Sequence, residues 1–104
     1  MFQQENDREA IDELNRAIYL SPYLAPAHLL LGRSLLRTGR VHEAIDTFKI
    51  ALWSTETAEA HAALGEAYRQ AKDVAAARAE AERALVLDPA SSDARALLAR
   101  LDGR

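Results

Sequence analysis

One nine-residue stretch occurs twice in this chain and limits what the chain can fold into. Residues 27–35 read AHLLLGRSL, and residues 60–68 read AHAALGEAY. Histidine, leucine and glycine keep the same spacing in both copies. Self-similarity at a fixed offset of about 20 to 50 residues is the signature of a stacked repeat. The sequence therefore predicts a stack of similar structural units.

Apolar residues recur with the period of an α-helix along nearly the whole chain, and no segment alternates like a strand. The period and its breaks predict a first helix over 6–20, a helix pair over 25–53, a second pair over 58–87 and a closing helix over 91–102. Turns of a few residues between helices predict antiparallel neighbours. We therefore predict a single all-α domain of six helices over residues 1–104.

Polar residues and glycine mark the predicted helix ends. Short side chains with an oxygen acceptor cap helix amino termini, and glycine at a carboxyl terminus adopts the left-handed conformation. On this basis Gly39 and Gly103 end helices, and the predicted caps are Asn6 or Asp7, Thr57, Asp73, and Ser91 or Ser92.

The helices that follow each copy repeat as well. Ala44, Phe48 and Ala51 return one repeat later as alanines at 77, 81 and 84, and they are preceded one repeat earlier by Ala10, Leu14 and Ala17. In chain order, the distance in sequence from the second of these sets to the third is one residue shorter than the distance from the first to the second. The missing residue falls in the 53–57 turn. Each repeat unit is therefore a pair of helices with small residues on the second.

This pattern resembles the tetratricopeptide repeat, a helix–turn–helix unit of about 34 residues. The resemblance implies a right-handed α-solenoid of about two and a half units, in which the first unit has only its second helix and the last only its first. The positions that match the family signature are Leu31, Gly32, Leu35, Ala44, Phe48 and Ala51 in one unit, and Leu64, Gly65, Tyr68, Ala77, Ala84 and Pro89 in the next.

Three features of the packing follow from the resemblance. Gly32 and Gly65 are expected where paired helices cross closely, so larger residues there would force the helices apart. Ala81 replaces the phenylalanine found at Phe48 one unit earlier, so the helix over 74–87 is expected to be less firmly anchored. The first helix is expected to be covered on one side only, which favours a C-terminal piece of a larger protein closed by the 91–102 helix.

Composition argues against several classes of function. The net charge of −3 lacks the basic surplus of a nucleic-acid binder, and cysteine is absent. No apolar run approaches the ~20 residues of a membrane span, and residues 1–9 are polar, so we expect no membrane insertion, no signal peptide and a cytoplasmic location. No catalytic motif appears and no cofactor or metal is expected. His28 and His61 are interpreted as packing positions, and Glu80 and Glu82 as a solvated helix face.

The resemblance implies a protein-interaction module that binds a peptide or protein segment on its concave face. Leu29 and Ala62 stand where the family's carboxylate clamp has lysines, which argues against recognition of chaperone tails. Arginines beside apolar residues suit a segment with acidic residues and an apolar anchor. The candidate binding positions are Leu29, Arg33, Leu36, Arg37, Glu59, Glu66, Arg69, Gln70 and Arg100.

A second surface supports an alternative function. Tyr19, Trp53 and Val86 share one repeat position, where the family usually has a charged residue. Either each side chain folds over its neighbouring turn, or the row is an outer interface. In the second case the chain is a structural spacer or an oligomerisation segment that self-associates through this row and the exposed first helix.

Overall fold

The computed structural model describes residues 2–22 and 25–103 of the chain. Within these residues it contains six α-helices and no strand, which confirms the predicted all-α class. The predicted 1–104 domain includes residues 1, 23, 24 and 104, which lie outside the described residues. The helices are α1 (Phe2–Leu20), α2 (Ala25–Arg37), α3 (Val41–Ser54), α4 (Ala58–Gln70), α5 (Val74–Leu87) and α6 (Ser92–Leu101).

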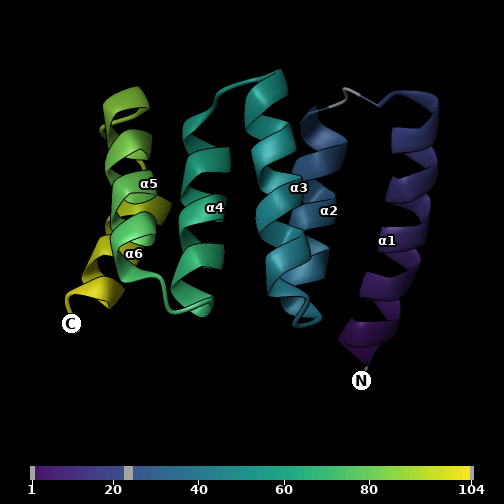
Figure 1. Cartoon of the computed structure of the whole chain (residues 1–104), viewed down its shortest axis with the longest axis horizontal. Helices are drawn as coiled ribbons and strands as arrows, with labels where there is room; N and C mark the ends of the chain where they lie inside the picture. Colours follow the sequence, from purple (N-terminus) through teal and green to yellow (C-terminus); the bar gives the residue numbers. More distant parts are fainter. Residues whose placement is uncertain (1, 23–24, 104) are drawn as a thin grey trace.

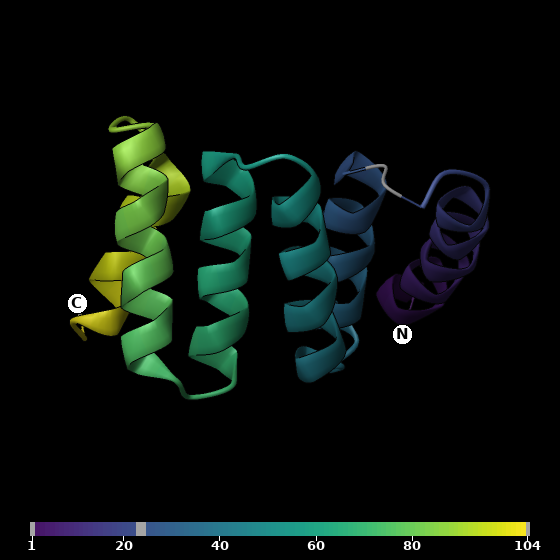
Figure 2. The same ribbon diagram turned by 45° about the horizontal axis from the view of Figure 1, so that its top comes forward.

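The helices stack along the long axis of the molecule as antiparallel neighbours (Figure 1). Helix α2 pairs with α3 and α4 pairs with α5, while α3 packs against α4 and joins the two pairs. Helix α4 also contacts α2 and α6, so these three helices form one layer. The turned view shows α2 behind α3 and α6 behind α5 (Figure 2). This arrangement is a helical-repeat solenoid measuring 37 × 31 × 20 Å.

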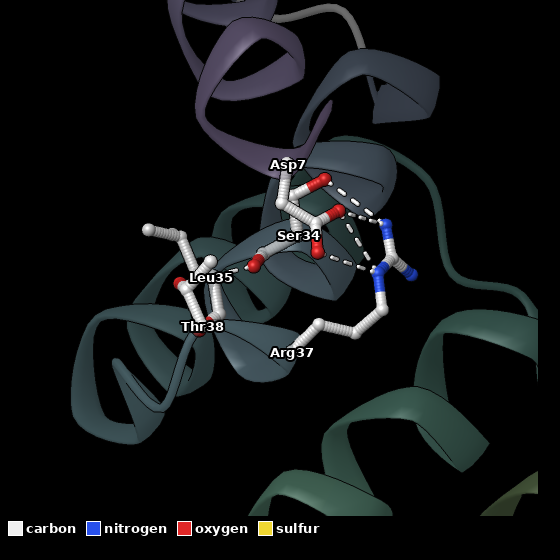
Figure 3. A network of polar contacts seen from close by, with 5 residues as sticks. All are labelled: Asp7, Ser34, Leu35, Arg37 and Thr38. Carbon is white, nitrogen blue, oxygen red and sulfur yellow. Dashed lines mark hydrogen bonds and ion pairs between the residues drawn. The ribbon is translucent and has the colours of Figure 1, made fainter. Parts of the chain in front are cut away.

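The start of α1 differs from the prediction. We expected Asn6 or Asp7 to cap a helix beginning there, but α1 already begins at Phe2. The Asp7 side chain is buried and accepts hydrogen bonds from Arg37 of α2, at 3.0 Å from Nε and 2.8 Å from Nη2 (Figure 3). Arg37 also donates to Ser34 at 3.2 Å. Asp7 therefore joins α1 to α2 instead of capping α1.

The other predicted helix ends are confirmed. The side chains of Thr57, Asp73 and Ser91 accept hydrogen bonds from the backbone N–H three residues on, at 3.1, 3.1 and 3.2 Å. Gly39 has a φ of +84° after α2, as its left-handed role requires. Lys72 stands one repeat later after α4 and takes the same conformation, with a φ of 67°. The two turns are thus equivalent although only one contains glycine.

Both glycines of the repeat lie at close helix crossings, as predicted. A Cβ added at Gly32 would lie 2.6 Å from Cδ1 of Phe48 on α3. A Cβ added at Gly65 would lie 2.6 Å from Cδ2 of Leu97 on α6 and 3.1 Å from the carbonyl oxygen of Ala77 on α5. Leu97 therefore occupies, beside Gly65, the kind of space that Phe48 occupies beside Gly32.

Helix α1 is the least covered helix in the part of the chain that the structure describes. It packs against α2 alone, whereas α3 has neighbours on two sides. Ile11 is buried in the core, but Leu14 and Ile18 are only partly buried. The residue of α3 that is equivalent to Leu14, Phe48, is completely buried. These burials agree with the expectation that the first helix is covered on one side only.

Candidate functional site

A groove crosses the layer formed by α2, α4 and α6. Its volume is about 280 Å³. The buried side chains of Phe48 and Leu97 form its floor, which ties the shape of the groove to the packing of the core. Its lining residues are Arg33, Leu36, Phe48, Ala62, Ala63, Glu66, Asp93, Ala96, Leu97 and Arg100.

Small and apolar side chains leave this groove open between the helices. Ala62 and Ala63 come from α4, Ala96 from α6 and Leu36 from α2. Because alanine projects only a methyl group, the helix backbones border the open space closely. The groove therefore presents an apolar surface between the three helices.

Arginine and carboxylate side chains surround the apolar surface. Arg33 binds Glu59 at 2.8 Å, and Arg100 of α6 lies 3.3 Å from Glu66 of α4. Glu66 also accepts from Nη2 of Arg69 at 2.6 Å. The side chains of Arg33 and Arg100 are 34% and 58% exposed, so both guanidinium groups keep N–H donors beyond those used in these ion pairs.

Glu66 is the carboxylate that its surroundings perturb most clearly in the groove. Partial burial alone would raise its pKa. Hydrogen bonds from Arg69 and Gln70, with the charges of Arg69 and Arg100, outweigh this effect and hold the pKa of Glu66 below its ordinary value. Glu66 is therefore ionised at neutral pH and connects α4 to α6 across the groove.

The low pKa of Glu66 predicts a pH-dependent contribution to stability. A carboxylate whose pKa is lower in the folded state stabilises the fold above its unfolded pKa, and this contribution is lost as pH falls through the folded value. We expect Glu66→Gln to lower the free energy of unfolding by on the order of 1 kcal/mol or less near neutral pH. The difference from the native chain should shrink as pH falls through the folded pKa of Glu66, as urea unfolding at neutral and at acidic pH would measure. A difference independent of pH would contradict a charge-based role.

The groove contains four of the predicted binding residues. Arg33, Leu36, Glu66 and Arg100 line it, together with Ala62. Leu29 and Glu59 instead line a second hollow of about 260 Å³ beside Pro26 and Thr57. The guanidinium of Arg37 is bound to Asp7 of α1. Arg69 and Gln70 do not line the groove, and both donate hydrogen bonds to Glu66.

The prediction missed several lining residues. Ala63, Asp93 and Ala96 line the groove but were not singled out from the sequence. The repeat was a usable signal for one of them, because Ala96 follows Ala63 at the same offset that separates the two glycines of the repeat. It therefore occupies the same position on the next helix of the layer.

The two repeat histidines are buried, which agrees with their interpretation as packing positions, but their contacts differ. The Nε2 atom of His28 lies 2.8 Å from the carbonyl oxygen of Pro22. His61 bonds through Nδ1 to Glu80 at 2.8 Å, and its Nε2 lies 3.3 Å from Glu56 without hydrogen-bond alignment. The interpretation of Glu80 as part of a solvated face is therefore wrong, because His61 draws it against α4.

Glu56 extends this cluster to an arginine. Arg83 of α5 donates to its Oε1 at 2.8 Å. The guanidinium of Arg83, and after it the imidazole of His61, hold the pKa of Glu56 below its ordinary value. These contacts join the turn before α4 to α5, on elements outside the groove. No group of three or more His, Cys, Asp or Glu side chains within the described residues could hold a metal ion.

A row of exposed apolar residues follows the carboxyl ends of α1, α3 and α5, which all point to the same edge of the molecule (Figure 1). Tyr19 is 85% exposed, Trp53 81% and Val86 70%. Neither aromatic side chain is therefore covered by its neighbouring turn, and that alternative is wrong. Leu20 and Leu87 are exposed next to Tyr19 and Val86, and we call these five residues the terminal row.

None of the helices within residues 2–22 and 25–103 is both long enough and apolar enough to cross a membrane. The stack of helix pairs, with its groove on one layer, defines the chain as a helical-repeat protein. A family model of the tetratricopeptide repeat matches residues 29–94, well over half of the chain. The chain belongs to the tetratricopeptide repeat family.

Solved structures of similar fold agree with this assignment. The first tetratricopeptide domain of Spaghetti (RPAP3), solved with the HSP90 peptide SRMEEVD, is 21% identical; it has a TM-score of 0.90 and the match covers 98% of this chain and 82% of that one. The Arabidopsis OM64 domain is 20% identical, with a TM-score of 0.91 and coverage of 98% and 85%. A tetratricopeptide protein of Thermus thermophilus is 28% identical over 94% of this chain and 50% of that chain, with a TM-score of 0.85. The comparison with curated proteins found no significant match.

Proposed function

We propose that this chain is a non-enzymatic protein-interaction module that binds a peptide segment in the groove of α2, α4 and α6. The observation that carries the proposal is the groove itself, where alanine and leucine side chains border an open space between Arg33 and Arg100 on different helices. A segment with an apolar anchor would bury that residue over Phe48 and Leu97, while its carboxylates bind the guanidinium groups.

The charges around the groove indicate how a ligand would compete for the arginines. Arg33 already binds Glu59, and Arg100 is 3.3 Å from Glu66. Exposed ion pairs of this kind contribute about 0–1 kcal/mol, so a ligand carboxylate can add to or replace them at small cost. The mixed charge also disfavours polyanions, because Glu59, Glu66 and Asp93 would repel them. The proposed ligand is therefore a moderately acidic segment of a protein.

Peptide selection tests this function with a defined probe. A phage library of random octapeptides would be panned against the native chain, and we expect enrichment of peptides in which an apolar residue is flanked by Asp or Glu. The variant Arg33→Glu/Arg100→Glu should lose their binding by roughly tenfold or more, since two attractive charges become repulsive. Fluorescence anisotropy with an enriched peptide would measure the loss.

A matched control separates the groove from net charge. Arg78→Glu/Arg95→Glu changes the charge equally at arginines that do not line the groove. We expect this control to keep the native affinity. Equal loss in both variants, or no enrichment of any peptide, would reject the groove as the binding site. Circular dichroism would verify that each variant retains its helices.

The groove is expected to select different peptides from those of a carboxylate clamp. Leu29 and Ala62 replace the lysines of that clamp, and Leu29 lies in a separate hollow rather than in the groove. The RPAP3 domain was solved with the peptide SRMEEVD. Used as a second probe, this peptide should bind the present chain more weakly than the selected octapeptides.

We propose self-association through the terminal row as a second function, independent of the groove. Tyr19, Trp53 and Val86 expose most of their surface to solvent at one repeat position. Large exposed apolar residues gathered along one edge are typical of an interface, whereas a single one would be unremarkable. Mass measurement across a concentration series tests this function without any ligand.

A further inference from the structure

We infer that two copies of this chain associate about a two-fold axis that passes beside Trp53, each terminal row packing on the other. This inference rests on the self-association proposed above and specifies its partner and geometry. The terminal row, Tyr19, Leu20, Trp53, Val86 and Leu87, lies at one edge of the stack and away from the groove of α2, α4 and α6. The two surfaces can therefore function at the same time.

The order of residues along the terminal row is self-complementary. Trp53 lies in the middle, one repeat after Tyr19 and one repeat before Val86. Each end of the row carries two neighbouring apolar residues, Tyr19 with Leu20 and Val86 with Leu87. A two-fold axis beside Trp53 would place each end against the opposite end of the second copy. An interface of this isologous kind needs the same patch on both partners, as the row provides.

A hollow at the α1 end of the row gives the opposite end a place to pack. It is shallow, has a volume of about 440 Å³ and is lined by Asn15, Arg16, Tyr19 and Leu20. Its surface is mainly apolar. Under the two-fold arrangement, Val86 and Leu87 of the second copy lie over this hollow and are withdrawn from water together with Tyr19 and Leu20.

Charges beside the row favour a second copy over an unrelated apolar partner. Arg16 borders the hollow, and Glu82 lies one helical turn before Val86. Both are exposed, and neither takes part in an ion pair within the part of the chain that the structure describes. The two-fold axis brings Arg16 of each copy towards Glu82 of the other, giving two complementary contacts at the rim.

The remaining basic side chains near the row are engaged within their own chain. Arg83 would otherwise face Arg16 of the second copy, but its guanidinium binds Glu56 at 2.8 Å. The ammonium of Lys49, near the proposed axis, lies 5.9 Å from the centroid of the Tyr68 ring on α4. Like charges therefore do not dominate the proposed interface.

Sedimentation velocity over a concentration series tests the dimer, with Trp53 fluorescence as a local probe. Trp53 is the only tryptophan of the chain, so its emission should move to shorter wavelength as the dimer forms. We expect Trp53→Ser to weaken the dimer by roughly tenfold or more, because interface tryptophans dominate binding energy. Val74→Ser removes an exposed apolar residue outside the row and should leave the dimer unchanged.

Charge reversal tests the two-fold geometry separately. Arg16→Glu and Glu82→Arg should each weaken the dimer a few-fold, and the double variant should restore the native affinity because both pairs form again with opposite sign. A monomer at all concentrations would reject self-association itself. A dimer that Trp53→Ser leaves intact, or a double variant that stays weak, would reject the two-fold arrangement. None of these results would affect peptide binding in the groove.

Discussion

Phe48→Ala is expected to lower the free energy of unfolding by about 3–5 kcal/mol, as large aromatic truncations in a packed core do. Phe48 is completely buried, and its ring fills the space beside Gly32 where α2 and α3 cross. Domains of this size are stable by about 5–15 kcal/mol, so this loss is a large part of the total. The variant should unfold at a clearly lower urea concentration than the native chain, as circular dichroism would measure.

Ile50→Ala is the matched control for this prediction. Ile50 lies on the same helix two residues later, and 41% of its surface is exposed. Surface substitutions usually change stability by less than about 0.5 kcal/mol, and the lost exposed side chain should cost at most slightly more. Equal losses at the two positions would contradict the close packing of Phe48 on Gly32. Phe48 also forms the groove floor, so its removal should weaken peptide binding where Ile50→Ala does not.

The fold could be predicted from the sequence because each repeat feature has a local physical cause. Glycine at 32 and 65 is needed for close crossings, and polar caps at Thr57, Asp73 and Ser91 define helix starts. Each of these residues can be recognised from its near neighbours in the sequence. The start of α1 was predicted wrongly because Asp7 binds Arg37, which is far away in the sequence. A cap and a buried ion pair use the same carboxylate, and helical period alone does not distinguish them.

The candidate site was only partly predictable for a related reason. Repeat register places Arg33, Leu36, Glu66 and Arg100 on one layer of helices, and all four line the groove. Register does not determine where a long side chain extends, so Arg37 was assigned to the same surface although its guanidinium reaches α1. The contact between His61 and Glu80 was missed for the same reason, because the long side chain of Glu80 reaches from α5 to His61 on α4. In this fold, the contacts of long polar side chains are therefore what the sequence does not predict.

Leu97 of α6 compensates in part for the phenylalanine that α5 lacks at Ala81. Ala81 leaves a smaller side chain where Phe48 stands one unit earlier, which predicted a weaker anchor for α5. Leu97 of α6 is buried against Gly65 and fills space at that crossing. The closing helix therefore contributes to the core of the second unit as well as covering its end. Whether α5 is less firmly held stays a prediction.

Gly65→Leu is expected to lower the free energy of unfolding by about 2 kcal/mol or more, because it overpacks this crossing. Its Cβ would lie 3.1 Å from the backbone carbonyl oxygen of Ala77 and 2.6 Å from Cδ2 of Leu97. The backbone contact can be relieved only by moving α5 away from α4. Replacing a glycine within a helix gains up to about 1 kcal/mol in helix propensity, which is smaller than the expected strain. The melting temperature should fall by roughly 10 °C, as calorimetry would measure.

Two controls identify the origin of that loss. Ala79→Leu adds the same side chain to an exposed position of α5 and should change stability by less than about 0.5 kcal/mol. The pair Gly65→Ala and Leu97→Ala should couple, since removing Leu97 removes the nearest atom to the new methyl group. Gly65→Ala should therefore cost less in the Leu97→Ala background than in the native chain. Additive losses, or a Gly65→Leu variant as stable as the native chain, would mean that α4, α5 and α6 do not meet closely at Gly65.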